Sequence, residues 1–313
     1  MTLPSAANPN ITSGGLIGEG KLEYFAGMGP LGQTYLARYC AIPQGLAVGE
    51  LESSVAAAAL EFPLIAKPDV GFCGHGVRLI QDLTGLRDYL AGFPAGETVV
   101  LQEYLQQEGE AGIFYARDPL TGKGSLLGLA LRHFPRVVGD GEHTIRQLIG
   151  VDLRLHRLIH PAHQIAEDLQ RVPSRGEVVR LAVIGSTRVG GLYRDGACHL
   201  TSELQARIDA IARDMPDFHF GRFDVRFDTL ADLRAGRGFK IMEINGAGSE
   251  AIQAWDPELG LACAFRIIFR KQRVLYRIAD ARRARGVRPI GLCALARLFF
   301  RQRRLIPLYP PSN

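Results

Sequence analysis

The chain has 313 residues, of which 47% are hydrophobic and 22% charged, so it can bury a sizeable core and is not expected to be globally disordered. Its five cysteines are widely spread and form no CxxC pair, which argues against a zinc site or a disulfide framework and favours a reducing, cytoplasmic setting. We expect no signal peptide and no transmembrane helix, because the first residues lack a basic and apolar leader and no apolar run is long enough.

Charge is distributed unevenly along the chain. Residues 264–313 hold 13 Lys or Arg residues and one acid, Asp280, a local charge of +12. Since the whole chain carries +5, the preceding 263 residues carry −7. A basic tail of this kind either packs on the acidic body of its own chain or of a second subunit in a homodimer, or lies on anionic lipid at the inner membrane face. Nucleic-acid binding is the least favoured alternative, because aromatic platforms and a known motif are missing.

The predicted elements alternate between helices and strand pairs. Residues 1–20 are rich in Gly, Ser, Asn and Pro and predict loops. Helices are predicted over 31–43, 53–62, 83–93, 139–150, 201–215, 265–278 and 289–310. Strands are predicted over 63–68, 77–80 and 98–105, and as pairs over 112–117 with 125–134, 177–186 with 188–195, and 221–228 with 239–245. Strands that arrive mostly as hairpins indicate an α+β fold rather than a doubly wound parallel sheet.

The last strand pair carries acidic side chains. Side chains alternate between the two faces of a strand. In GRFDVRFD, Arg222 and Asp224 therefore lie on one face and the phenylalanines on the other. In FKIMEIN, Ile241, Glu243 and Asn245 share a face. If the strands pair through residues 229–238, Asp228 faces Phe239, and Asp224 then faces Glu243 while Arg222 faces Asn245.

Two carboxylates at cross-strand distance repel each other unless a cation lies between them. A ligand set of carboxylates and an amide carbonyl suits magnesium, which commonly keeps phosphate oxygens as further ligands, and Arg222 beside it suits phosphate. The alternative is a solvated sheet face whose acids are neutralised by Arg222 and Arg226.

A second motif, KPDVGFCGHG at 67–76, places Lys67 at the end of an apolar strand before a glycine loop. Glycines let backbone N–H groups approach an anion, and a lysine adds a point charge. The spacing matches neither a Walker loop nor a dinucleotide fingerprint. The alternative is a hairpin turn made flexible by glycine.

In family order, these segments resemble those of ATP-grasp proteins, in particular D-alanine–D-alanine ligases and the ATP-grasp part of cyanophycin and glutathione synthetases. The resemblance spans about residues 30–260 and includes IAKPDVGFCGHGV, QEYLQQEGE, RHFPRVVGDGEHTIRQLI, GRFDVRFD and IMEINGAGS. It implies two lobes with ATP between them, a reduced N-terminal segment (1–43), a small nucleotide lobe (44–102), a large catalytic lobe (103–262) and a basic helical extension (263–313).

The resemblance also implies roles for individual residues. Lys67 and Arg222 would be catalytic, and Asp224, Glu243 and Asn245 would bind Mg2+, as two ions, with Mn2+ as an alternative. The nucleotide would contact Lys67, Gly71, Gly74, Gly76, Glu103, Tyr104, Leu105, Glu110 and Arg132, with Glu110 on the ribose. Backbone N–H groups of 246–249 would meet an oxyanion. Two departures are the short segment before residue 31 and the absence of a lysine from MGPLGQTY.

The implied activity is an ATP- and magnesium-dependent ligase that joins a small carboxylate to an amine through an acyl phosphate. Alternatives are an ATP-grasp kinase, a ligase with a thiol acceptor, or a nucleotide-binding regulatory subunit without activity of its own. His156, His160 and His163 are spaced like metal ligands, but Pro161 interrupts them and favours a surface loop. Arg180 and Arg188 either bind a substrate carboxylate or are plain charges on a sheet surface. Cys73 is interpreted as a small filler of the glycine loop, and Trp255 as a packing residue, with the lining of an acceptor site as the alternative.

Overall fold

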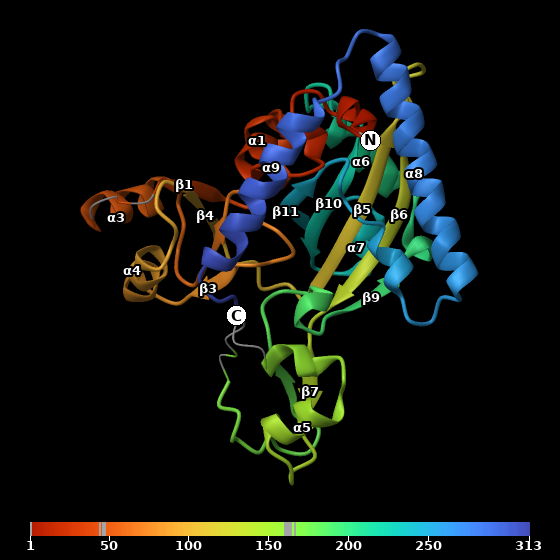
Figure 1. The fold of residues 1–313 in the computed structure, drawn as a ribbon. Helices are drawn as coiled ribbons and strands as arrows, with labels where there is room; N and C mark the ends of the chain where they lie inside the picture. Colours follow the sequence, from red (N-terminus) through yellow and green to blue (C-terminus); the bar gives the residue numbers. More distant parts are fainter. Residues whose placement is uncertain (1, 44, 46–47, 160–164, 166) are drawn as a thin grey trace. The chain divides into compact units, whose positions relative to one another are not determined.

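The computed structural model describes residues 2–43, 45, 48–159, 165 and 167–313 (Figure 1). The chain forms two compact units. Unit 1 comprises Met1–Ala37, Leu105–Leu131 and Tyr193–Leu305, and unit 2 comprises Arg38–Tyr104, Arg132–Leu192 and Ile306–Asn313. Helices and antiparallel strand pairs occur together, which confirms the α+β class. The units divide the chain by contacts, so the four-part division by function stays a prediction.

Unit 1 is built on a five-stranded sheet in the order β11-β10-β5-β6-β9. Its strands are β5 (Gly109–Arg117), β6 (Gly124–His133), β9 (Leu192–Asp195), β10 (Phe220–Phe227) and β11 (Phe239–Asn245). In β10 the alternating residues Phe223, Val225 and Phe227 are buried, as the period of a strand requires. The opposite face of β10 therefore carries Arg222, Asp224 and Arg226.

Helices surround this sheet in unit 1. They are α1 (Lys21–Ala26), α2 (Pro30–Tyr35), α6 (Ser202–Arg213), α7 (Leu230–Arg234), α8 (Leu261–Ala284) and α9 (Leu292–Leu305), with short 3-10 turns η1 (Leu3–Ala7), η2 (Thr12–Gly15), η5 (Ala197–His199) and η6 (Ile252–Trp255). The amphipathic α6 begins as predicted, because the Thr201 hydroxyl accepts a hydrogen bond from Leu204 N–H. The basic α8 packs on η1, η6 and β5 of the same chain, with Leu275 and Ile278 buried.

Unit 2 contains a four-stranded sheet in the order β1-β4-β2-β3. These strands are β1 (Tyr39–Pro43), β2 (Leu64–Pro68), β3 (Arg78–Ile80) and β4 (Thr98–Glu103), accompanied by α3 (Val48–Ala57) and α4 (Leu83–Ala91). The rest of unit 2 has a small hydrophobic core of its own. The elements around this core are β7 (Arg136–Val138), α5 (Ile145–Val151), η3 (Leu155–Ile159), β8 (Val178–Arg180) and η4 (Thr187–Val189). The short turn η7 (Ile306–Leu308) follows α9 in the chain. None of the helices in the described ranges combines the length and the apolar character needed to cross a bilayer.

Two predicted elements are wrong in kind, and a third, the helix expected over 53–62, instead spans Val48–Ala57. The helix expected over 31–43 ends at Tyr35, and Tyr39–Pro43 instead forms β1, which pairs antiparallel with β4 and buries Ile42. The hairpin expected over 177–195 does not form, because β8 pairs with β7 whereas β9 joins the sheet beside β6. In both cases pairing with a strand far along the chain outweighs the local pattern.

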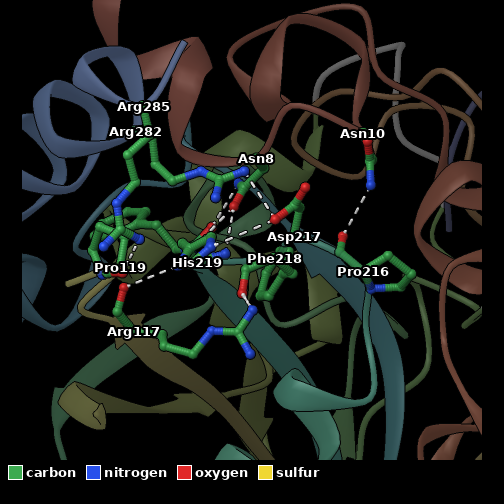
Figure 2. A network of polar contacts seen from close by, with 11 residues as sticks. Asn8, Asn10, Arg117, Pro119, Pro216, Asp217, Phe218, His219, Arg282 and Arg285 are labelled. Carbon is green, nitrogen blue, oxygen red and sulfur yellow. Dashed lines mark hydrogen bonds and ion pairs between the residues drawn. The ribbon is translucent and has the colours of Figure 1, made fainter. Parts of the chain in front are cut away.

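The predicted N-terminal loops are short turns that Asn8 fastens to the start of β10 (Figure 2). The Asn8 Oδ1 accepts from the backbone N–H groups of His219 (2.9 Å) and Phe220 (3.1 Å). Its Nδ2 donates to Phe220 O (2.8 Å) and Gly14 O (3.1 Å). All four hydrogen-bonding positions of this buried amide are therefore used.

We expect Asn8→Ala to lower the free energy of unfolding by about 2–4 kcal/mol, because it leaves two buried N–H groups without an acceptor. Asn10 is the matched control, since its exposed side chain donates only to Pro216 O at 3.3 Å (Figure 2). Urea unfolding of both variants tests this, and equal losses for Asn8→Ala and Asn10→Ala would contradict it.

Candidate metal and phosphate site

The acidic ends of β10 and β11 pair as the sequence predicts. The register places Arg222 opposite Asn245, Phe223 opposite Ile244 and Asp224 opposite Glu243. The two carboxylates and the amide therefore come from directly facing positions of neighbouring strands. Adjacent strands hold such side chains within reach of one another.

The same strands contain an irregularity that the sequence did not reveal. Val225 faces Ile241 and Phe227 faces Phe239, so the register shifts between Asp224 and Val225 and leaves Met242 as an extra residue in β11. The predicted pairing of Asp228 with Phe239 is wrong, because Phe227 takes that position. The bulge also places Ile241 in the core opposite Val225, so Ile241 does not share the face of Glu243 and Asn245.

Asp224 is the most buried carboxylate of the site, with 1% of its surface exposed. Arg222 forms a bidentate ion pair with Asp224, with Nε 2.6 Å from Oδ1 and Nη2 2.9 Å from Oδ2. Asn245 Nδ2 also donates to Oδ2, at 3.1 Å. A buried charge is tolerated when it is paired and hydrogen-bonded in this way, so the site holds an ionised aspartate in a preformed position.

Gly112 of β5 makes room for this ion pair, and sequence reasoning missed it. It faces Asp224 across the β10–β5 pairing. A Cβ atom on Gly112 would lie 2.9 Å from Arg222 Cδ and 3.1 Å from Asp224 Oδ1. The available signal was a glycine inside an otherwise apolar strand, which often marks a close approach.

Glu243 differs from Asp224 because about a third of its side chain is exposed, 35%. Lys21 of α1 supplies its counter-charge, with Nζ 3.4 Å from Glu243 Oε1. Burial raises the pKa of the nearby Glu19, and Lys21 acts in the opposite direction. Lys21 thus places a cation where the negative charge of the site reaches solvent, a contact that no sequence motif indicated.

The residues fit a hard metal ion in their chemistry. Asp224, Glu243 and Asn245 offer carboxylate and amide oxygens, the donors that Mg2+ prefers, and a magnesium site needs only one or two carboxylates when phosphate completes it. Within the described parts of the chain no cluster of three or more His, Cys, Asp or Glu side chains is arranged to hold a metal, so this candidate depends on two acids and one amide.

The loop that follows the motif cannot act as predicted. Ala247 N–H donates to Gly14 O (3.1 Å), Gly248 N–H to Gly15 O (2.6 Å) and Ser249 N–H to Gly246 O (3.0 Å). These N–H groups are occupied by the N-terminal segment and by the loop itself, so the expectation that they stabilise an oxyanion is wrong.

In unit 2, Lys67 lies on β2 and is buried. Its Nζ donates to Gln102 Oε1 of the neighbouring β4 at 2.7 Å. The following loop turns through positive φ at Cys73 (46°), Gly74 (75°) and Gly76 (73°). Only glycine adopts this backbone conformation without strain. This conformation explains why Gly74 and Gly76, two of the three glycines expected to contact phosphate, are glycines.

Arg188 and the C-terminus fasten this glycine loop within unit 2. Arg188 Nε donates to Cys73 O, and its Nη2 to Gly74 O, both at 2.9 Å. The same Nη2 donates to Ser312 Oγ at 2.7 Å, and Tyr309 Oη donates to Val70 O at 2.6 Å. Arg188 therefore supports the glycine loop from η4, and its interpretation as a plain charge on a sheet surface is wrong.

The predicted adenine hinge coincides with a boundary, since unit 2 passes into unit 1 between Tyr104 and Leu105. Glu103 closes β4 and forms an ion pair with Arg38, with Nε 2.8 Å from Oε2. Glu110 is buried in β5 against Arg226, with 3.1 Å between Oε2 and Nε. A ribose contact by Glu110 stays a prediction, and Arg132 lies half-buried near the end of β6.

The surroundings of the other residues weighed from the sequence are as follows. His160, Pro161 and His163 fall outside the described residues, and His156 bonds through Nε2 to Gly150 O at 2.7 Å. Arg180 stacks on the Phe134 ring, 3.4 Å from its centre, and Trp255 is exposed.

Comparison with known proteins gave structural likenesses only. No family model matches the chain, and no curated protein matches it. A D-alanine–D-alanine ligase from Bacillus anthracis aligns with 88% of this chain and 71% of its own, at 15% identity and a TM-score of 0.49. The D-cycloserine synthetase DcsG aligns with 82% of this chain and 70% of its own, at 13% identity and 0.42.

A bifunctional glutathione synthetase from Pasteurella multocida aligns with 77% of this chain, at 15% identity and a TM-score of 0.39. This chain covers only 35% of that enzyme's length. Two of these three names are those of enzymes that the sequence motifs resemble. Because the TM-scores lie below 0.5, these likenesses establish neither a family nor an activity for this chain.

We expect Gly112→Ala to displace the Arg222–Asp224 ion pair and lower the free energy of unfolding by about 1–3 kcal/mol, since the new methyl group overpacks a buried site. Gly150→Ala is the control, because a Cβ there meets nothing within 4 Å and alanine favours its helix. Urea unfolding of both variants measures the difference, and a Gly112→Ala protein as stable as the wild type would refute the close approach.

Proposed function

We propose that the protein is an ATP- and magnesium-dependent ligase of the ATP-grasp type, which joins a small carboxylate to an amine through an acyl phosphate. The observation that carries the proposal is the pairing of Asp224 with Glu243 and of Arg222 with Asn245 on facing positions of β10 and β11. This cluster combines oxygen donors for a hard cation with a guanidinium suited to a phosphoryl group.

In this proposal Asp224, Glu243 and Asn245 hold Mg2+, as two ions, and Lys21 leaves Glu243 when the metal binds. The metal would neutralise charge on the ATP phosphates. Arg222 would serve two purposes, because its Nε and Nη2 hold Asp224 while Nη1, now donating to Glu250 O at 3.2 Å, would donate to a phosphoryl oxygen in place of that carbonyl. A preorganised cation of this kind stabilises charge as it develops on the transferred group.

The following residues would supply the nucleotide contacts. Lys67 donates to a phosphate in place of Gln102, and the loop containing Gly71, Gly74 and Gly76 covers the phosphates and excludes water that would hydrolyse an acyl phosphate. The adenine edge meets the backbone at Glu103, Tyr104 and Leu105. Glu110 and Arg132 complete the set as the ribose and phosphate contacts, and of these Glu110 must first exchange its partner Arg226.

A kinase, a thiol ligase and an inactive regulatory subunit would use the same nucleotide site. The ligase is favoured over a regulatory subunit because the Arg222–Asp224 ion pair occurs together with the facing carboxylates, and the partly exposed Glu243 is not needed for folding. Mass spectrometry of the products distinguishes an amide from a thioester or a phosphate ester.

The exposed side of α8 and α9 favours a second partner, an anionic lipid surface. Phe265 and Phe269 stack with ring centres 6.0 Å apart and are both exposed, as are Phe299 and Phe300 on α9. Exposed aromatic rings on helices rich in arginine suit the membrane interface, where rings enter the headgroup region and cations meet lipid phosphates. The alternative is that a second copy of the chain packs on the same aromatic face and forms a homodimer.

We expect Glu243→Gln to lower ATP-dependent phosphate release by at least about 100-fold while the melting temperature stays unchanged, because it removes charge from a half-exposed metal ligand. Glu52→Gln, at an exposed site in α3, is the control. The assay screens carboxylates and amines in pairs with ATP and Mg2+. Wild-type rates in Glu243→Gln would exclude the assigned role. Lys67 is a less clean test, because its loss also leaves buried Gln102 unpaired.

For the lipid contact, we expect sedimentation with vesicles containing anionic lipid and none with neutral vesicles. Replacing Phe265 and Phe269 together by Ser should reduce pelleting, whereas Leu120→Ser, an equally exposed position in the β5–β6 turn, should not. Pelleting that is independent of lipid charge would contradict the lipid contact. Self-association of the wild type that disappears in the double variant would indicate a homodimer instead.

A further inference from the structure

The glycine loop of unit 2, residues 71–76, is held at both of its ends by tyrosine hydroxyl groups. Tyr309 Oη donates to Val70 O at 2.6 Å, just before the loop. Tyr89 Oη donates to Gly76 O at 2.7 Å, at the other end. Both tyrosines are buried, with 8% of Tyr309 and 0% of Tyr89 exposed. Two buried hydrogen bonds therefore fix the points at which the loop begins and ends.

An aromatic ladder joins these two tyrosines. The Phe93 ring stacks on Tyr89, with 5.7 Å between ring centres, and on Tyr309, with 5.3 Å. Stacking of buried rings stabilises their relative positions. Tyr309 also packs closely on Gly76, because a Cβ at that glycine would lie 3.0 Å from Tyr309 Cβ. The two ends of the loop are thus connected through side chains as well as through the loop itself.

The middle of the loop is held through its carbonyl groups. Arg188 Nε donates to Cys73 O, and its Nη2 donates to Gly74 O. The same Nη2 donates to the hydroxyl of Ser312, a residue with 1% of its surface exposed. Ser312 therefore helps to orient the guanidinium that holds the loop. All of these residues belong to unit 2.

Tyr309 and Ser312 belong to one segment, residues 306–313, which follows α9 and packs along β3. Pro311 O accepts a hydrogen bond from Arg78 Nε at 3.0 Å. Asn313 Oδ1 accepts one from Leu79 N–H at 2.8 Å. Both partners lie on β3, the strand that directly follows the glycine loop. The segment is therefore anchored on this strand while it contacts the loop.

The hydrogen bonds to the loop carbonyl groups also determine where the loop N–H groups point. In a trans peptide, the carbonyl group and the next N–H group point to opposite sides. The bond to Val70 O therefore orients the N–H of Gly71, and the bond to Cys73 O orients that of Gly74. Among the described residues, the Gly74 N–H has no acceptor. Gly71 and Gly74 are two of the three glycines that the proposed function assigns to phosphate.

We propose that Tyr309 and Ser312 are positioning residues of the phosphate site, so that the affinity of the protein for ATP depends on the 306–313 segment. They hold the loop carbonyl groups away from the phosphates, which carbonyl oxygens would repel, and leave N–H groups to meet them. This inference deepens the proposed function, and rests on it for the statement that the loop binds the ATP phosphates.

The test compares the affinities for ATP and for adenosine, measured by isothermal titration calorimetry with Mg2+. Tyr309→Phe keeps the stacked ring but removes the hydroxyl that holds Val70 O. We expect it to weaken ATP binding by roughly fivefold or more and to leave adenosine binding unchanged, because the loop acts on the phosphates alone. Tyr276→Phe, at an exposed position in α8, is the matched control and should change neither affinity.

Arg188→Lys separates positioning from charge. Lysine keeps the positive charge but lacks the planar, multidentate guanidinium that holds two carbonyl groups and Ser312 Oγ. We expect this variant to weaken ATP binding by roughly tenfold. Ser312→Ala should have a smaller effect, because Arg188 keeps its bonds to the loop. If Arg188 acted only as a charge near the phosphates, Arg188→Lys would bind ATP as the wild type does.

The inference is overturned if Tyr309→Phe and Arg188→Lys bind ATP as tightly as the wild type. It is also overturned if their affinities for ATP and adenosine fall together, because the segment would then only stabilise the fold. ATP binding that depends on Tyr309, with no turnover for any pair of substrates, would retain the positioning role and reject the ligase. Ligase turnover with unchanged ATP affinity in Tyr309→Phe would retain the ligase and reject the positioning role. A wild type that binds no ATP would reject both.

Discussion

The ion pair of Arg222 with Asp224 is the constraint on which the rest of unit 1 depends. A carboxylate that is almost fully buried in a sheet must have its charge balanced and its oxygens hydrogen-bonded, and Arg222 and Asn245 meet both requirements. Gly112 has no side chain because the pair occupies the space where one would lie. The bulge at Met242 then aligns Glu243 with Asp224, so that one acid is fixed inside the protein while the other reaches solvent.

The N-terminal segment supports this arrangement from the side of β11. Gly14 and Gly15 accept hydrogen bonds from the loop after Asn245, and Lys21 pairs with Glu243. From the sequence, this segment was expected to be reduced, with loops over residues 1–20. It instead contacts the metal motif directly, and Asn8 joins it to the start of β10. The C-terminal extension contacts the same loop, because Lys271 Nζ of α8 donates to Ala247 O.

The sequence predicted the elements whose patterns are local and the site residues that lie in short motifs. The strands of Asp224 and Glu243, the α6 helix and the two basic helices were all predicted. The facing of Asp224 with Glu243 was correct although the register counted from the turn was wrong by one residue, because a bulge is not visible in an alternating pattern. Strand β1 and the partners of β8 and β9 depend on distant pairing, which local propensity does not encode. Lys21 and Gly112 were missed because their importance arises from neighbours far along the chain.

The proposed site requires that the facing side chains of β10 and β11 bind a divalent ion, which in turn binds the triphosphate of ATP. The most direct measurement is a crystal structure with Mn2+ and a non-hydrolysable ATP analogue, in which anomalous scattering locates the metal. We predict manganese bound to Asp224, Glu243 and Asn245, with phosphate oxygens completing its ligands and Lys21 displaced from Glu243. Manganese and nucleotide at a different place, with the Lys21–Glu243 ion pair intact, would contradict it.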